Sequence, residues 1–246
     1  MQLKSNYQIK RYDLHAHTKY SDGALTFEES LYKRAKIADV LGFSDHYRYL
    51  IAESGKLDAY CNAFENLKRS LANDAECQNE LKLGVEIFLA DLQQAMKNIV
   101  SHPFEYIIIE NFEYFSNQHE VMDAMKALIS AFNEMGRDVD IILAHPNYEV
   151  WFGHLQREGG LGIENMLSFL TLNEIALEIN INTGYFFQKG NFIEALSDET
   201  DIIVEILKRH KVLVSIGSDC HAYEDELLNN FNLAYTYFLS QSKSFQ

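Results

Sequence analysis

Short apolar runs rich in β-forming residues alternate along this chain with longer amphipathic segments. The apolar runs predict seven strands, which read in order RYDLHAH, VLGFSDH, LKLGVEIFL, FEYIIIENF, DIILAHP, IALEININ and VLVSIGSDCH. Between them, apolar residues recur every three or four positions, the period of a helix with one buried face. The alternation predicts parallel βα units, and we expect one α/β domain over residues 1–246 without an internal boundary.

The helices are predicted from this periodicity and from one capping signal. Thr26 is followed three residues later by Glu29, the pattern of a capping box, so a helix should begin there. The segment 57–72 places four large apolar residues on one helical face, and we expect that face to pack on the sheet. Further helical periodicity covers residues 119–135, 163–172, 199–210 and 224–240.

Histidines and carboxylates stand at the carboxyl ends of the predicted strands rather than inside them. They are His15, His17, His46, Glu86, His145, Asp219 and His221. In parallel α/β folds, and in barrels above all, these strand ends form one mouth where ligands bind. His15 and His17 are two residues apart, so on an extended strand both side chains point to the same side, and Asp219 and His221 repeat that spacing. The sequence therefore predicts that residues two hundred positions apart converge.

Imidazoles mixed with carboxylates favour Zn²⁺, Mn²⁺ or Fe²⁺ over Ca²⁺, which prefers oxygen ligands alone. With Asp22, which follows the first pair of histidines, the candidate ligands are His15, His17, Asp22, His46, Glu86, His145, Asp219 and His221. Eight ligands are too many for one tetrahedral ion. We expect two or three divalent ions, with a hydroxide activated between them as the nucleophile and with Asp219 and His221 as the residues that handle protons.

Six motifs in one order carry a resemblance to a known family. They read DLHAHTKYSDG, GFSDH, GVEIF, LAHP, ALEIN and SIGSDCH, and they resemble the polymerase and histidinol phosphatase (PHP) superfamily over residues 11–223. The resemblance implies a distorted (β/α)7 TIM-like barrel of the PHP type, a trinuclear metal site built from the eight residues above, and phosphoesterase activity. The implied substrate is a small phosphomonoester, similar to histidinol phosphate or to a nucleotide. The SDG form of the first motif is more similar to the family's generic phosphoesterases and polymerase-linked barrels than to its histidinol phosphatases.

The chain departs from the family pattern after the fourth predicted strand. Members of the family usually carry another histidine there, whereas this sequence reads EYIIIENFEYF, with Phe112 at about that position. Glu110, Glu113 or His119 could replace the missing ligand. If none does, the third ion is weak or absent and the reaction runs on two.

Several other residues have possible roles at the mouth. Arg48 and Lys189 are candidates for binding a substrate phosphate, because a phosphate needs positive or donating groups besides the metals. Asp13 shares a strand face with His15, so it either orients that histidine or is buried in an ordinary salt bridge. Glu178 shares a strand face with Asn180 and Asn182, so it either orients a ligand from behind or makes plain surface or core hydrogen bonds. Trp151 lines a pocket wall or packs in the core.

The composition restricts the kind of ligand that we expect and indicates the cellular compartment. The net charge of −15 disfavours a long nucleic acid, which is held mainly by Lys and Arg, but permits a small phosphorylated substrate once metal ions supply local positive charge. The three cysteines, Cys61, Cys77 and Cys220, show no paired spacing, which indicates a reducing cytoplasm. No leader and no apolar run near 18 residues is visible, so we expect no membrane association. Oligomeric state stays open.

Two other functions remain alternatives. Amidohydrolase-type C–N hydrolases are also barrels that begin with HxH and end with an aspartate, although they usually need a metal-bridging lysine at the end of a middle strand, and this sequence has none there. The second alternative is a non-catalytic metal-binding remnant of a PHP barrel, which only the missing histidine near Phe112 supports.

Overall fold

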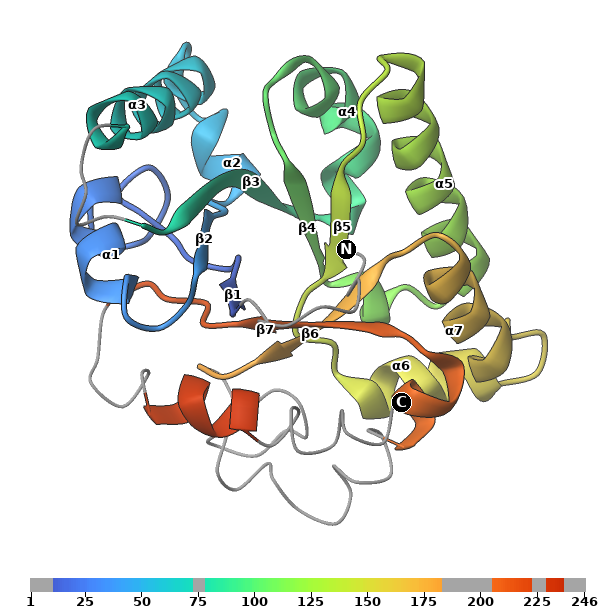
Figure 1. The fold of residues 1–246 in the computed structure, drawn as a ribbon. Helices are drawn as coiled ribbons and strands as arrows, with labels where there is room; N and C mark the ends of the chain where they lie inside the picture. Colours follow the sequence, from blue (N-terminus) through green and yellow to red (C-terminus); the bar gives the residue numbers. More distant parts are fainter. Residues whose placement is uncertain (1–10, 73–77, 183–204, 223–228, 237–246) are drawn as a thin grey trace.

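Seven parallel strands follow one another around the molecule in sequence order (Figure 1). The computed structural model describes residues 11–72, 78–182, 205–222 and 229–236. The strands are β1 (Tyr12–Asp13), β2 (Val40–Phe43), β3 (Glu80–Phe88), β4 (Tyr106–Glu110), β5 (Asp140–Leu143), β6 (Ala176–Asn180) and β7 (Leu213–Gly217). Each of the seven predicted strands is therefore present.

Helices alternate with the strands, as the sequence pattern predicts. They are α1 (Phe27–Arg34), α2 (Tyr47–Leu50), α3 (Lys56–Leu71), α4 (Leu92–Ser101), α5 (Gln118–Glu134), α6 (Tyr148–Gln156) and α7 (Ile163–Leu172), with 3-10 turns η1 (Leu89–Asp91) and η2 (Phe112–Tyr114). Residues 205–210 and 229–236 are helical as well, within two of the predicted ranges. None of the helices in the described ranges is long and apolar enough to cross a membrane.

The capping box at the start of α1 is present as predicted. The Glu29 N–H donates to Thr26 Oγ1 at 3.2 Å, and the Thr26 N–H donates to Glu29 Oε2 at 2.8 Å. Two of the N–H groups that lack partners at a helix start are thereby satisfied. The cap fixes where the chain leaves the loop that carries Asp22 and enters the helix.

The first and last strands lie next to each other and nearly close the barrel (Figure 1). They are joined by an isolated parallel bridge between Ala16 and Cys220 rather than by a continuous ladder. The His17 N–H donates to the Cys220 carbonyl at 3.0 Å, and Ser218 Oγ donates to the His15 carbonyl at 3.0 Å. These bonds bring the first and last sequence motifs together.

Asp13 stabilises this closure through a buried ion pair. Arg34 is fully buried; its Nε donates to Asp13 Oδ2 at 2.9 Å and its Nη2 to the Asp13 carbonyl at 2.8 Å. Asp13 Oδ1 accepts the Ser218 N–H at 2.9 Å. Of the two roles that the sequence left open for Asp13, the structure shows the salt bridge, which ties α1 to β1, while the hydrogen bond from Ser218 ties the end of β7 to β1.

A tyrosine fills the barrel interior below the mouth. Tyr106 is fully buried, and its hydroxyl donates to the Leu14 carbonyl at 2.6 Å. Gly42 and Gly84 make room for it, because a Cβ at either position would lie 2.3 Å from atoms of the Tyr106 ring or hydroxyl. The remaining apolar residues of this inner cluster are Leu14, Val40, Ile108, Ile142 and Ala144. The barrel is therefore a packed core that supports a site at its end.

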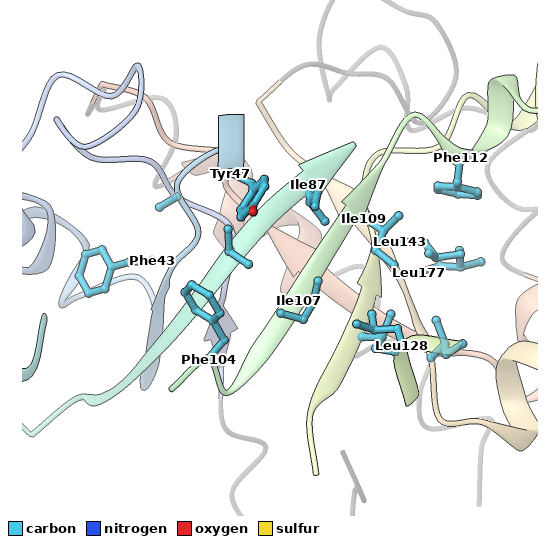
Figure 2. Packing of buried hydrophobic residues seen from close by; sticks show 14 of the residues in the cluster. Phe43, Tyr47, Ile87, Phe104, Ile107, Ile109, Phe112, Leu128, Leu143 and Leu177 are labelled. Atoms are coloured by element: carbon cyan, nitrogen blue, oxygen red, sulfur yellow. The ribbon is translucent and has the colours of Figure 1, made fainter. Parts of the chain in front are cut away.

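The larger apolar cluster lies between the strands and the helices. Figure 2 shows Ile107 and Ile109 of β4 in this cluster together with Phe112 and Leu128. Because side chains alternate along a strand, Ile108 and Glu110 point to the opposite side, toward the barrel interior and its mouth. The outward isoleucines therefore determine the direction in which Glu110 points.

Candidate metal centre

Four side chains from distant elements meet at the carboxyl ends of β1, β3 and β7. His15 Nε2 lies 3.2 Å from Glu86 Oε1 and 3.5 Å from Asp219 Oδ1. His17 Nε2 lies 3.1 Å from Asp219 Oδ1 and 3.3 Å from Glu86 Oε2. All four residues are buried, with 6% exposure or less. The shared direction of His15 and His17 that the sequence predicts is thus present.

A second group lies at the rim of the mouth and consists of His17, Asp22, His46 and His221. His221 Nε2 is 3.3 Å from Asp22 Oδ1, and His46 Nε2 is 3.5 Å from Asp22 Oδ2. The rings of His17 and His221 stack with centroids 4.1 Å apart. We call these four residues the rim group. Asp22 and His221 are about one-third exposed, so this group faces solvent.

His145 approaches from the end of β5. Its Nε2 lies 3.4 Å from Glu86 Oε1, and its backbone N–H donates to Glu178 Oε2 at 3.2 Å. All eight predicted ligands therefore lie around one mouth, with Glu86 contacted by histidines from both sides.

The spacing of the buried donors fits bound cations better than ion pairs alone. Metal–ligand bonds of about 2.0–2.2 Å place neighbouring donor atoms roughly 3–3.5 Å apart. The four distances from His15 and His17 to Glu86 and Asp219 are 3.1 to 3.5 Å, while His46 Nδ1 lies closer to Glu86 Oε2, at 2.9 Å. Hydrogen bonds between charged groups are shorter, about 2.7–2.9 Å. Within the described residues His15 Nε2, Glu86 Oε2 and Glu110 Oε1 are buried at the mouth without a hydrogen-bond partner, and Glu113 Oε2 is a further such atom outside these groups. Such atoms are costly unless something binds them.

Glu178 holds His15 in this orientation. His15 Nδ1 lies 2.7 Å from Glu178 Oε1, the normal length of a charge-assisted hydrogen bond, so Nε2 is the nitrogen left to face the mouth. Gly217 makes this contact possible, because a Cβ there would lie 2.0 Å from Glu178 Oε1. The structure thus gives Glu178 the orienting role rather than plain surface or core hydrogen bonding.

Two of the predicted ligands have backbone angles in the left-handed region. The φ angle is 30° at His145 and 48° at Asp219. Such conformations cost a non-glycine residue about 1–3 kcal/mol and persist only where surrounding contacts enforce them. Asp219 is fixed by Asn180, whose Nδ2 donates to Asp219 Oδ2 at 3.2 Å, and by Asn182, whose Nδ2 donates to the Asp219 carbonyl at 2.9 Å. Strained backbone therefore coincides with the site.

Carboxylates dominate the electrostatics of the mouth. Burial alone would lower the pKa of His46, but its pairing with Asp22, Glu110 and Glu86 outweighs burial and raises the pKa to about 12. Burial likewise disfavours the charged form of His145, yet Glu86 raises the pKa of His145 to about 9. The pKa of Asp22 is lowered against its burial by hydrogen bonds from His221 and His46.

The carboxylates of the mouth also give it an excess of negative charge. The carboxylates at the mouth are Asp22, Glu86, Glu110, Glu178 and Asp219. Histidines that bind metal must be neutral. With its histidines neutral, the mouth would therefore carry five negative charges from its carboxylates. Two divalent ions would leave a net charge of −1, and three would leave +1.

The structure distinguishes among the three residues that could replace the missing histidine, which lie at the end of β4 and after it. Glu110 lies in the mouth, with Oε1 3.3 Å from His46 Nδ1. Glu113 is buried elsewhere; its Oε1 accepts the Asn147 N–H at 3.4 Å, and burial raises its pKa. His119 is exposed in the first turn of α5. Of the three, only Glu110 belongs to a group with metal-binding geometry among the described residues.

Phe112 turns away from the mouth because the strand alternation breaks at Asn111. The φ angle of Asn111 is 60°, and η2 begins directly after it. Phe112 therefore packs into the outer core, where its ring meets Trp151 edge-on with centroids 5.2 Å apart. Trp151 is fully buried and donates from Nε1 to Gln118 Oε1 at 2.8 Å, so it packs in the core and does not line a pocket.

Of the two candidate phosphate-binding residues, only Arg48 lies within the described part of the chain. Arg48 is exposed on α2, forms an ion pair with Asp91 and lies over the Phe88 ring at 3.9 Å. Its guanidinium is thus already partnered close to the mouth. Lys189 lies outside the described residues. Cys220, between two candidate ligands in the sequence, is buried in the apolar core.

Sequence reasoning missed Asp45. This buried carboxylate accepts the Thr18 N–H at 2.8 Å, the Thr18 hydroxyl at 2.7 Å and the Ser21 hydroxyl at 2.5 Å. It therefore holds the turn that returns Asp22 to the mouth. The available signal was its position directly before His46 in the motif GFSDH.

No protein-family model matches this chain, and a search of the curated proteins returned no similar sequence.

Proposed function

We propose that this protein is a metal-dependent phosphoesterase of the PHP type that hydrolyses a small phosphomonoester with two or three divalent ions, Zn²⁺, Mn²⁺ or Fe²⁺. The observation that supports the proposal most directly is the set of buried donors 3.1 to 3.5 Å apart at the strand ends, two of which have no hydrogen-bond partner in the described part of the chain. Such a mouth is where barrel enzymes place their chemistry.

Divalent ions bound there would supply Lewis-acid charge to the phosphoryl oxygens and lower the pKa of water. The chain's own groups hold those ions in fixed positions. Glu178 orients His15, and Asn180 with Asn182 orients Asp219, so little reorganisation is needed when substrate binds. Preorganisation of this kind is the main contribution of a protein to phosphoryl transfer.

Proton transfer is assigned to Asp219 and His221, as the sequence suggests. Asp219 Oδ1 faces the imidazoles of His15 and His17, where the proton of an attacking water could be accepted. His221 lies at the rim, and its Nδ1 is 3.0 Å from the Asp219 carbonyl, which fixes the ring with Nε2 toward Asp22. The leaving-group oxygen would receive its proton from His221 Nε2–H on this exposed side, a role that His221 has only while Nε2 carries a proton and binds no ion, and the proton that Asp219 accepts from water balances it.

Substrate recognition is assigned to Arg48 together with Lys189. The Arg48–Asp91 pair is exposed, so solvent screens it and a phosphate can take the place of the Asp91 carboxylate. A guanidinium binds two phosphate oxygens at once, which would orient the ester toward the ions. The net charge of −15 favours a small ligand over a long nucleic acid.

The C–N hydrolase and the non-catalytic metal-binding protein each differ from a phosphoesterase in a feature that can be checked. A C–N hydrolase of the amidohydrolase type needs a bridging lysine, and the described carboxyl ends of β3 to β6 carry none. A non-catalytic metal-binding protein would bind ions but turn over no ester.

One experiment separates these functions. The purified chain is incubated with p-nitrophenyl phosphate, a broad panel of phosphomonoesters and a panel of amides, with and without added Mn²⁺. We expect Mn²⁺-dependent release of phosphate, with a loss of at least about 10²-fold in kcat/KM for His17→Ala. His210→Ala is the matched control, because His210 pairs with Glu164 before β7, at the opposite end of the strands. Absence of turnover on every phosphoester would refute the proposal, and amide cleavage would favour the C–N hydrolase.

A further inference from the structure

Two donor groups at the mouth differ in chemical character. The rim group, His17, Asp22, His46 and His221, has three imidazoles and one carboxylate. Another group, His46, Glu86 and Glu110, has two carboxylates and one imidazole, and we call it the acidic group. In both groups the donor atoms lie within 4.8 Å of one another.

His46 lies between the two groups and faces each with a different nitrogen. Its Nε2 lies 3.5 Å from Asp22 Oδ2 in the rim group, while its Nδ1 lies 2.9 Å from Glu86 Oε2 and 3.3 Å from Glu110 Oε1 in the acidic group. A neutral imidazole coordinates through one nitrogen. The acidic group therefore depends on its two carboxylates more than on His46.

The two carboxylates converge on a single donor. Glu86 and Glu110 are 1% and 6% exposed, and Glu86 Oε2 and Glu110 Oε1 both lack a hydrogen-bond partner within the described ranges. A single N–H on His46 Nδ1 cannot satisfy both oxygens, and two buried like charges so close together repel each other. A divalent cation between them would satisfy both oxygens and remove the repulsion.

We propose that Glu110 takes the place of a histidine ligand and makes the acidic group a carboxylate-rich position that favours Mn²⁺ over Zn²⁺ more strongly than the rim group does. The inference rests on the metal centre of the proposed function. The physical reason is ligand type: carboxylates suit Mn²⁺, whereas imidazoles suit Zn²⁺. The preference is relative, because Zn²⁺ generally binds a given set of ligands more tightly than Mn²⁺.

Metal binding without any substrate tests this proposal. The metal-free chain is dialysed against Mn²⁺, against Zn²⁺ and against equal concentrations of both. Bound metals are counted by mass spectrometry, and Mn²⁺ is also followed by electron paramagnetic resonance. The variants are Glu110→Gln, which keeps the shape and removes the charge, Glu110→His, which supplies an imidazole, and Glu113→Gln, which alters the neighbouring buried carboxylate outside the metal-binding groups. Circular dichroism shows whether each variant is folded.

We expect Glu110→Gln to lose one bound Mn²⁺ or to weaken it at least about tenfold, since even loss of a ligand-orienting partner costs 10–100-fold in affinity. We expect Glu110→His to raise the bound Zn²⁺:Mn²⁺ ratio about tenfold or more, and Glu113→Gln to resemble wild type. The proposal is overturned if Glu110→Gln binds Mn²⁺ as wild type does, if Glu110→His leaves the ratio unchanged, if only Glu113→Gln loses Mn²⁺, or if wild type binds neither ion.

These outcomes are separable from those of the phosphoesterase proposal. Metal binding that depends on Glu110 in a chain without turnover would support this inference and refute the proposed reaction. If the chain shows Mn²⁺-dependent hydrolysis but the Glu110 variants bind Mn²⁺ and Zn²⁺ as wild type does, this inference is overturned and the proposed reaction stands.

Discussion

The contact between Gly217 and Glu178 gives the sharpest test of how the site is supported. Replacing Gly217 with alanine would place the new Cβ 2.0 Å from Glu178 Oε1 and 2.9 Å from His15 Cβ. Gly217 lies on β7 and pairs with Asn180 of β6, so its own backbone is held in the sheet. The Glu178 carboxylate is therefore the group that must move most, and the contact with His15 Cβ requires a smaller shift as well.

The size of the effect follows from this distance. An ordinary carbon–oxygen contact is about 3.4 Å, so Glu178 Oε1 must move by roughly 1.4 Å. Starting from 2.7 Å, its hydrogen bond with His15 Nδ1 would then be lost. Losing the partner that orients a ligand histidine costs about 10–100-fold in metal affinity. Overpacking of the buried site should also lower the free energy of unfolding by about 1–3 kcal/mol.

Isothermal titration of the metal-free variant with Mn²⁺ measures the affinity, and urea unfolding measures the stability. Gly153→Ala on α6 is the matched control, because a Cβ there meets nothing within 4 Å, and it should leave Mn²⁺ affinity unchanged while adding up to about 1 kcal/mol of helix stability. An affinity of Gly217→Ala within twofold of wild type would show that Glu178 does not orient His15 for binding.

Three further predictions concern the buried ion pair, the pH dependence of stability and the release of protons on metal binding. Arg34→Met should lower the free energy of unfolding by about 3–5 kcal/mol in urea denaturation, because it leaves the Asp13 carboxylate buried without its cation; a loss below about 1 kcal/mol would contradict this. The pKa of His145, raised to about 9, means that its ion-pair stabilisation is complete below pH 6.5 and is lost as the pH rises through 9. The metal-free chain should therefore become less stable over that window in thermal unfolding. Mn²⁺ binding at pH 7 should release protons, measured by calorimetry in buffers of different ionisation enthalpy, and no release would show that His145 and His46 do not bind the ion.

Local patterns were enough to predict most of the architecture. Alternating apolar and amphipathic segments predicted the strands and their parallel order, and Thr26 with Glu29 predicted the start of α1. These features depend on neighbouring residues, which the sequence displays directly. The convergence of His15 and Asp219 could be predicted too, because strand ends of a parallel barrel share one mouth.

Tertiary structure alone decided which neighbours these residues have. The left-handed conformation of Asn111 sends Phe112 into the outer core and leaves Glu110 in the mouth, although strand alternation would place both on one side. Arg34 reaches Asp13 across 21 positions and Glu178 reaches His15 across 163. Such pairings depend on where packed helices and closing strands meet in space, which the periodicity of a single segment does not encode. The sequence by itself therefore determined which groups gather at the mouth, and the nearly closed barrel decided which of them orient, pair with or replace one another.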